Sequence, residues 1–145
     1  MSLPDTIIEG LKTYLLTYTG LDESAPVWVQ YLGPDPTQYA IAPLAGERVI
    51  DEYINGNRLM VYPFAFQSME STVEEVERLA NCGFYEQFAD WLDEQSDAGT
   101  LPDLPAGKTA ESIEAVGAGG YQMEEGESGT AIYQVQCELQ YEKQS

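Results

Sequence analysis

Histidine is absent from this 145-residue chain, and its two cysteines lie far apart in the sequence. Without histidine there is no Ser-His or Cys-His nucleophile pair, no imidazole general base and no His-ligated zinc site. Cys82 and Cys137 form no CxxC motif of the kind that binds metals or carries out redox chemistry. We therefore expect no catalytic residue, no bound metal and no cofactor.

Basic residues and long apolar runs are also scarce. Six basic residues against 25 acidic ones give a net charge of −19, which opposes nonspecific binding to nucleic acids and to anionic membranes. No apolar run approaches the roughly 18 residues of a membrane span. Glu9, Gly10 and Lys12 interrupt the apolar stretch near the N-terminus, which argues against a signal peptide. We expect a soluble cytoplasmic protein with reduced thiols, folded as one domain over residues 1–145.

What the chain does contain is one long periodic segment, residues 71–98. Ser71 and Glu74 fit a capping box, which predicts the start of a helix. Asn81–Gly83 resembles a helix C-cap and Gly99 gives a second stop, so we expect a helix pair. The apolar positions at helical spacing are Val73, Val76, Ala80, Phe84, Phe88, Trp91 and Leu92. The opposite side carries an acidic stripe, which consists of Glu86, Asp90, Asp93 and Asp97.

An N-terminal helix is also predicted. Apolar residues at helical spacing begin at Leu3 and end at Tyr18, with Pro4 in the first turn and Gly20 as the stop. Gly10 lies inside this helix and costs about 1 kcal/mol relative to alanine. Either close backbone packing or a bend explains a glycine at this position.

Strands account for most of the remaining chain. Alternating apolar residues predict a long C-terminal strand over Thr130–Glu142. Pro43 restricts one of the shorter strands to an edge or an end. These shorter strands are expected over Val27–Leu32, Tyr39–Leu44 and Ala110–Val116. Residues 117–129 are expected to form a flexible acidic loop that contains Glu124, Glu125 and Glu127. The pattern predicts an α+β fold, with a largely antiparallel sheet packed against the N-terminal helix and the central helix pair.

A β-hairpin is predicted around the Asn-Gly-Asn sequence at residues 55–57, which favours the positive φ angles of tight turns. Its strands are Val49–Ile54 and Arg58–Phe66. If the first two turn residues form the corner, Tyr53 pairs with Arg58; if the last two form it, Tyr53 pairs with Met60. The second register brings more apolar side chains together.

The second strand of this hairpin gives two conflicting signals. Residues 59–66 are apolar on both faces, which indicates a strand covered on both sides. Pro63 removes a ladder donor, which indicates an edge strand or a bulge. An edge strand covered by another subunit reconciles the signals, and a bulge in an ordinary core strand is the alternative. The first interpretation predicts an oligomer interface at Tyr53, Ile54, Arg58, Met60 and Tyr62.

Two other features imitate functional sites without matching them. Gly107–Thr109 is like the end of a phosphate loop, but the first glycine of that motif falls on Pro102 and a strand follows. The acidic stripe lies on one helix face, so it cannot place two carboxyl groups across a cleft as a glycosidase does. The stripe is a solubilising face, a surface that repels polyanions, or one that receives a basic partner.

Several stretches of the chain together resemble one family. These are NCGFYEQFADWLDEQ, LPDLPAGKTAESIEAV, YQMEE and AIYQVQCELQYE, in this order, together with the NGN hairpin. They are similar to minor capsid or tail-terminator (tail completion) proteins of long-tailed phages and prophages of Gram-positive bacteria, over most of the chain from about Val27 onward. The resemblance implies a structural virion protein, assembled in the bacterial host cytoplasm, that forms a hexameric ring. Such a ring ends growth of the tail tube and joins it to the head.

The same resemblance implies the partners. These are other copies of the chain, the tail-tube protein and head-completion proteins, while DNA passes through the ring without being bound. The net charge of −19 agrees with such a passage. Part of the acidic surface is then expected to line the lumen, either the stripe from Glu86 to Asp97 or the loop from Glu124 to Glu127. The alternative function is an acidic binding module, or nucleic-acid mimic, that occupies the basic surface of a partner.

Overall fold

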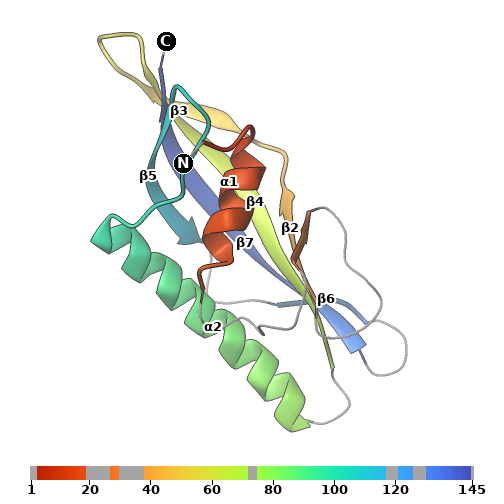
Figure 1. Cartoon of the computed structure of the whole chain (residues 1–145). Coiled ribbons are helices and arrows are strands. Elements are labelled where there is room, and N and C mark those ends of the chain that lie inside the picture. Colours follow the sequence, from red (N-terminus) through yellow and green to blue (C-terminus); the bar gives the residue numbers. More distant parts are fainter. Residues whose placement is uncertain are drawn as a thin grey trace.

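The computed structural model describes residues 3–18, 27–29, 38–71, 75–116, 121–125 and 130–144. Figure 1 shows the two helices and seven strands within these residues. In chain order they are α1 (Ile7–Leu15), β1 (Val27–Val29), β2 (Gln38–Pro43), β3 (Arg48–Glu52), β4 (Arg58–Ser71), α2 (Glu75–Ala98), β5 (Lys108–Ala115), β6 (Tyr121–Glu125) and β7 (Thr130–Lys143).

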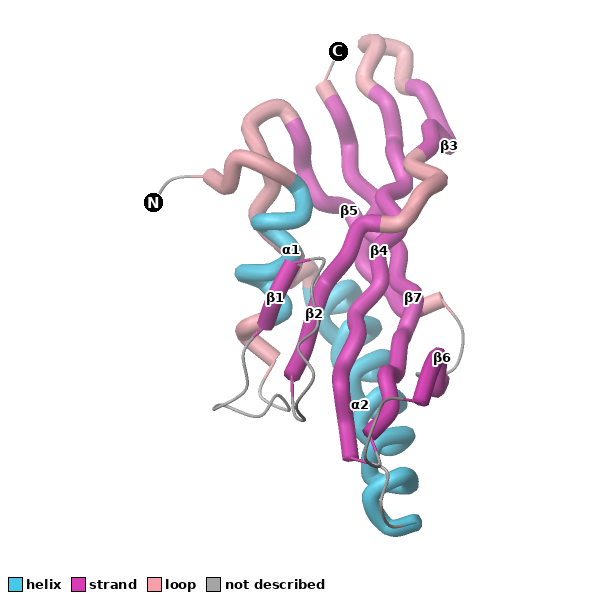
Figure 2. Tube along the Cα trace, turned by 90° about the vertical axis from the view of Figure 1, so that its right-hand side faces the viewer, coloured by secondary structure: helices cyan, strands magenta, loops and turns pink. Residues whose placement is uncertain are grey.

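Two long strands, β4 and β7, form the centre of the sheet. Each has 14 residues, and they pair antiparallel along their whole length. On the outer side of β4, β3 covers one end and β2 the other, and β5 and β6 divide the outer side of β7 in the same way. β1 extends the sheet beyond β2 in a parallel pairing (Figure 2). Both helices lie on one face of the sheet (Figure 1), which confirms the predicted single α+β domain with a largely antiparallel sheet.

The core lies between this face and the helices. The predicted C-terminal strand is confirmed, because its alternate residues are all buried: Tyr133, Val135, Cys137, Leu139 and Tyr141. Phe66 of β4 stacks on Phe88 of α2, with 4.7 Å between the ring centroids. Tyr85 is fully buried although it was not assigned to the apolar stripe, and its hydroxyl forms hydrogen bonds with Ser68 and with the carbonyl oxygen of Tyr133.

The N-terminal helix is confirmed with shorter bounds. Thr6 is the N-cap, and its hydroxyl accepts a hydrogen bond from the Glu9 amide at 3.2 Å. Gly10 sits where the helix meets the connection between α2 and β5. A Cβ atom at Gly10 would lie 2.2 Å from the carbonyl oxygen of Asp103. Close backbone packing therefore explains this glycine.

The central helix is continuous, which corrects the predicted helix pair. α2 runs through the C-cap that was predicted at Asn81–Gly83. The aromatic residues that follow, such as Phe88, are buried on the same sheet. Burying one such side chain stabilises by about 1.5–3 kcal/mol, which exceeds the roughly 1 kcal/mol cost of a helical glycine. Of the predicted capping box, Ser71 is the last residue of β4 and pairs with Thr130, whereas Glu74 lies outside the described residues.

The predicted stop at Gly99 is confirmed. Gly99 has a φ of 75°. Its amide donates to the Ser96 carbonyl at 3.2 Å, and the Thr100 amide donates to the Gln95 carbonyl at 2.9 Å. This is the pair of bonds of a Schellman motif.

We expect Gly83→Ala to raise the free energy of unfolding by about 0.5–1 kcal/mol, because alanine is the better helix former. A Cβ atom at Gly83 meets no atom within 4 Å, so the change adds no steric conflict. Urea denaturation measures the gain. Gly99→Ala is the matched control and should destabilise, since its φ of 75° strains an alanine. A loss of stability in Gly83→Ala would contradict a continuous helix.

The hairpin forms, but both predicted registers are wrong. Glu52 pairs with Arg58, and inside this pair Tyr53 and Asn57 flank a three-residue loop, residues 54–56. The Tyr53 amide donates to the Asn57 carbonyl at 2.8 Å, and the Gly56 amide donates to the Tyr53 carbonyl at 2.9 Å. Gly56, with a φ of 90°, takes the left-handed conformation that a three-residue hairpin loop requires. A bulge between Val49 and Asp51 then shifts the register by one more residue.

The expectation that β4 is an edge strand is also wrong. β4 lies inside the sheet, and it is covered on both faces as predicted, with Val61 and Phe64 almost fully buried. Pro63 sits where the partner strand changes, because β3 pairs up to Val61 and β2 begins at Phe64. On the side of β4 that faces β2 and β3, the Pro63 carbonyl accepts a hydrogen bond from the Leu44 amide at 3.0 Å. The missing amide therefore faces the junction between two partner strands, and no second subunit is needed to cover β4.

A strand replaces part of the predicted acidic loop. β6 pairs with the end of β7 that extends beyond β5 and places Glu124 opposite Ile132. β7 offers unpaired backbone groups there, which a strand satisfies better than a loop. The strands at β2 and β5 are confirmed with slightly shifted bounds, and Pro43 ends β2 as predicted. Predictions that lie outside the described residues are those for Gly20, residues 30–32, Val73, Glu74, residues 117–120 and residues 126–129, which include Glu127.

Candidate functional site

The structure separates the five residues of the predicted interface into two groups. Tyr53, Ile54 and Arg58 are exposed at the end of the β3–β4 hairpin. Met60 is only 9% exposed and belongs to the core cluster, and Tyr62 packs against that cluster. Met60 is therefore not available to a partner. The hairpin end, beyond the helix-covered part of the sheet, is the accessible part (Figure 1).

Two further residues, Val49 and Ile50, join the accessible group and were missed from the sequence. Their exposed fractions are 46% and 45%, and every residue of β3 is exposed. We call Val49, Ile50, Tyr53 and Ile54 the hairpin surface. Ile54 makes no contact that reduces its accessible area, since its exposed fraction is 109%. The sequence signal was the pair of adjacent apolar residues Val49 and Ile50, which a flat alternating strand cannot bury together.

Basic residues lie directly behind the hairpin surface. Arg58 pairs with Lys143 across β4 and β7, and Lys143 pairs with Lys108 across β7 and β5. These three residues form the basic row. Among the described residues, the row has no carboxylate oxygen within 4.0 Å, and the ion pair present is Arg48 with Glu138 at 3.6 Å. Glu52 of β3 lies opposite Arg58 at one end of the row. The line therefore carries three cations and one carboxylate, and its net positive charge favours an anionic partner.

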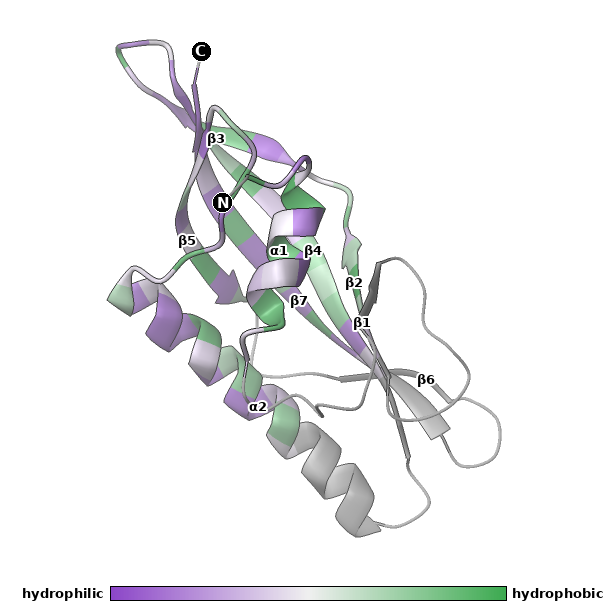
Figure 3. Cartoon of the chain, viewed as in Figure 1, coloured by the Kyte–Doolittle hydropathy of each residue, from purple (hydrophilic) through white to green (hydrophobic). Residues whose placement is uncertain are grey.

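The acidic stripe is exposed as predicted. Its four carboxylates lie on the outer side of α2, opposite the buried Phe88 and Leu92. Figure 3 shows hydrophilic and hydrophobic residues alternating along the described part of this helix. Asp93 and Asp97 also line a polar hollow of about 410 Å³ against β5, together with Glu114. The prediction that Phe84 and Trp91 pack with the core is confirmed as well.

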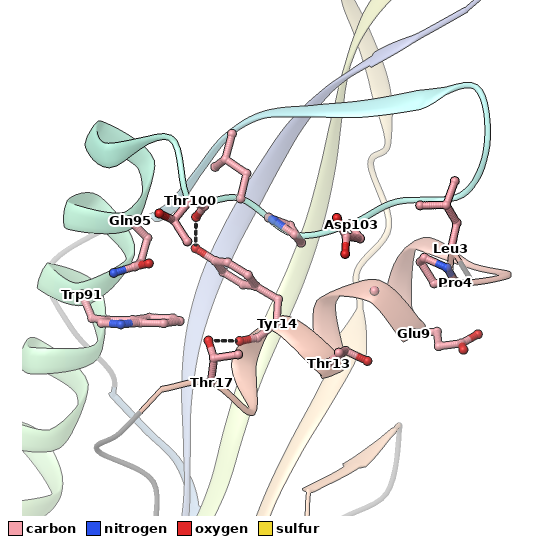
Figure 4. Close-up of a pocket in the computed structure, with 13 residues that line it drawn as sticks. Leu3, Pro4, Glu9, Thr13, Tyr14, Thr17, Trp91, Gln95, Thr100 and Asp103 are labelled. Atoms are coloured by element: carbon pink, nitrogen blue, oxygen red, sulfur yellow. Dashed lines mark hydrogen bonds between the residues drawn. The ribbon is translucent and has the colours of Figure 1, made fainter. Parts of the chain in front are cut away.

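A groove of about 650 Å³ lies between α1, α2 and the connection that follows α2. In Figure 4 the aromatic side chains of Tyr14 and Trp91 lie at one end and Glu9 at the other. The ring centroids of Tyr14 and Trp91 are 5.4 Å apart. The exposed carboxylates of Glu9 and Asp103 give the groove an acidic rim. The other lining residues are Leu3, Pro4, Gly10, Thr13, Thr17, Gln95, Thr100, Leu101 and Pro102.

Tyr14 fixes the shape of this groove. Its hydroxyl donates to the Thr100 carbonyl at 2.8 Å and so ties α1 to the connection (Figure 4). Burial raises the pKa of Tyr14 to about 12, so the phenol stays protonated and able to donate at neutral pH. Gly10 lets the same two segments approach closely. The groove is therefore held by contacts in its own wall, without a ligand.

No family model matches this chain, and no curated protein matches it significantly. Neither helix in the described part is long and apolar enough to cross a membrane. Among the residues that the structure describes, no three His, Cys, Asp or Glu side chains are placed to hold one metal ion. Burial also raises the pKa of the Cys137 thiol, which disfavours the reactive thiolate at neutral pH.

Proposed function

We propose that this protein is a structural virion subunit that forms a ring at the end of a phage tail tube and joins the tube to the head. The observation that carries the proposal is the hairpin surface, because four of the seven large exposed apolar side chains among the described residues belong to this one hairpin. Clustered exposed apolar residues mark a surface that meets another protein. The family resemblance supplies the ring, its six subunits and its place in the virion.

The charge distribution supports the same role. A ring that DNA traverses needs a surface that repels phosphates, and the acidic stripe offers four exposed carboxylates on one helix. The chain as a whole carries a net charge of −19. In this proposal the subunits contact one another and the tail tube, and DNA passes without being bound. The protein works by assembly and not by catalysis.

We expect Ile54→Asp to dissociate the ring. A carboxylate at the most exposed apolar position cannot enter an apolar contact without desolvation, which should weaken self-association by about 2 kcal/mol, or roughly 30-fold. Light scattering after size exclusion measures the assembly mass, with and without the tail-tube protein. Val116→Asp is the matched control, since Val116 is 47% exposed on a different part of the chain. An unchanged mass for Ile54→Asp would contradict the hairpin interface.

The second test of this proposal is whether the protein ends growth of the tail tube. The unmodified protein should shorten tubes when it is added to the polymerising tail-tube protein of the same phage. Ile54→Asp should leave the tubes long, and electron microscopy gives the length distribution. Tubes of equal length with and without the unmodified protein would refute the proposed role even if a ring forms.

An acidic binding module is the second candidate, and the polar hollow with Asp93, Asp97 and Glu114 favours it. Such a module accepts a basic surface and needs no ring. It should remain a monomer or dimer and bind its partner with steep salt dependence. A ring mass that persists in the absence of any partner would argue against this function.

A further inference from the structure

The end of the hairpin is a convex apolar feature that its own chain leaves uncovered. Ile54 has an exposed fraction of 109%, and Tyr53 beside it is 36% exposed. Hydrogen bonds hold the loop shape, because the Asn57 amide donates to Asn55 Oδ1 at 3.0 Å in addition to the two backbone bonds across the loop. The tip therefore presents Ile54 without having to be ordered on binding.

The groove between α1 and α2 is the concave feature that fits this tip. Its volume of about 650 Å³ lies within the range of sites that enclose a drug-sized ligand, so it has room for the Ile54 and Tyr53 side chains. Trp91 and Leu101, both half-buried, give it an apolar end. The polar hollow between α2 and β5 is a poorer match, because its lining has one apolar side chain, Ile113.

The charges of the groove and of the hairpin end are also complementary. The rim of the groove carries Glu9 and Asp103, and none of its lining residues is basic. The hairpin end carries the basic row, which starts at Arg58, four residues after Ile54, and has Glu52 opposite Arg58 at its outer end. Asp51 and Glu142 occupy the next positions of β3 and β7, so their side chains belong to the other face of the sheet. A docked tip would bring these cations toward the two carboxylates. This contact would relieve the repulsion within the row.

We propose that the hairpin tip of one copy docks into the groove of a second copy, with Ile54 against the Trp91 end and the basic row facing Glu9 and Asp103. The contact joins two different surfaces, so it is heterologous and closes into a ring when the rotation between copies allows it. This inference rests on the proposed ring and names the two surfaces that build it. Glu9, Asp103 and Trp91 are then positioning residues for assembly.

Cysteine cross-linking of the full-length chain tests the pairing. A mixture of Ile54→Cys and Thr13→Cys should form a covalent dimer on mild oxidation, because Thr13 is an exposed residue of the groove wall. The double variant should give a ladder that ends at the ring size. Leu16→Cys replaces Thr13→Cys in the control, since Leu16 is exposed on the same helix segment outside the groove. Docking raises the effective thiol concentration to the millimolar range, so we expect at least about tenfold more product through Thr13. The wild-type chain, oxidised in parallel, shows any background from Cys82 and Cys137.

Groove filling gives a second readout that needs no oxidation. Thr13→Trp should lower the assembly mass, whereas Leu16→Trp should leave it unchanged. Equal cross-linking through Thr13 and Leu16, or a covalent dimer from Ile54→Cys alone, would overturn the groove assignment and leave the ring proposal standing. A wild-type chain that stays monomeric both alone and with the tail-tube protein would overturn both.

Discussion

Gly10→Ala is expected to lower the free energy of unfolding by about 3 kcal/mol or more. The added Cβ atom would lie 2.2 Å from the Asp103 carbonyl oxygen and 3.2 Å from Pro4 Cγ. The first neighbour is backbone, so no side-chain rotation relieves the conflict and α1 has to move away from the connection. For a chain of this length the melting temperature should fall by about 10 °C, which differential scanning calorimetry measures.

The same movement alters the groove. Separation of α1 from the connection would stretch the hydrogen bond from the Tyr14 hydroxyl to the Thr100 carbonyl, now 2.8 Å, and widen the space between them. Gly10→Ala should therefore lose assembly even at temperatures where it remains folded. Gly83→Ala is the control, since the identical substitution there meets no atom within 4 Å. If Gly10→Ala were as stable as the wild type, the contact between the two segments would be softer than the structure indicates.

Only one half of the close contact between Gly10 and Asp103 could be recognised in the sequence. A glycine inside a periodic helix carries a local cost, and that cost is visible in the pattern. The partner, Asp103, lies 93 positions away, and no local pattern identifies it. The groove itself is built from three separate segments, at residues 3–17, 91–95 and 100–103, so it could not be predicted. The acidic stripe could be predicted, because helical periodicity alone defines it.

In the central helix, the burial of apolar side chains outweighs a local stop signal. Asn81–Gly83 is a plausible stop, yet the buried side chains of Tyr85, Phe88 and Leu92 continue the apolar face beyond it. Their combined burial outweighs one glycine, so the helix continues. The connection directly after Gly99, residues 100–107, contains no aromatic residue, and there the same residue type does end the helix.

The hairpin shows the limit of pairing rules. The Asn-Gly-Asn sequence correctly located the turn, but the loop has three residues and a bulge at Ile50 adds a further shift. Each change by one residue moves side chains to the other face of the strand. Maximising apolar pairs therefore selected the wrong register. The edge-strand interpretation assigned Met60 to an interface, although the structure places it in the core and leaves Val49 and Ile50 exposed.

Phe88→Ala is expected to cost about 3–5 kcal/mol, the usual range for removing a buried aromatic side chain. Phe88 is fully buried and joins three parts of the fold. Its ring centroid lies 4.7 Å from that of Phe66 on β4, 5.5 Å from that of Tyr18 after α1, and 6.1 Å from that of Trp91. The cavity that alanine leaves at this position would therefore loosen the contact of both helices with the sheet.

Chemical denaturation measures this loss, with Gln87→Ala as the control because Gln87 is the exposed neighbour on the same helix. Phe88→Leu keeps most of the volume and should cost less than half as much, which separates cavity formation from lost aromatic contact. Since Trp91 lines the groove and contacts Phe88, the alanine variant should also weaken assembly under conditions where the chain is still folded. A stability loss below about 1 kcal/mol would mean that the surrounding rings collapse into the cavity, and assembly should then be retained because the position of Trp91 is preserved.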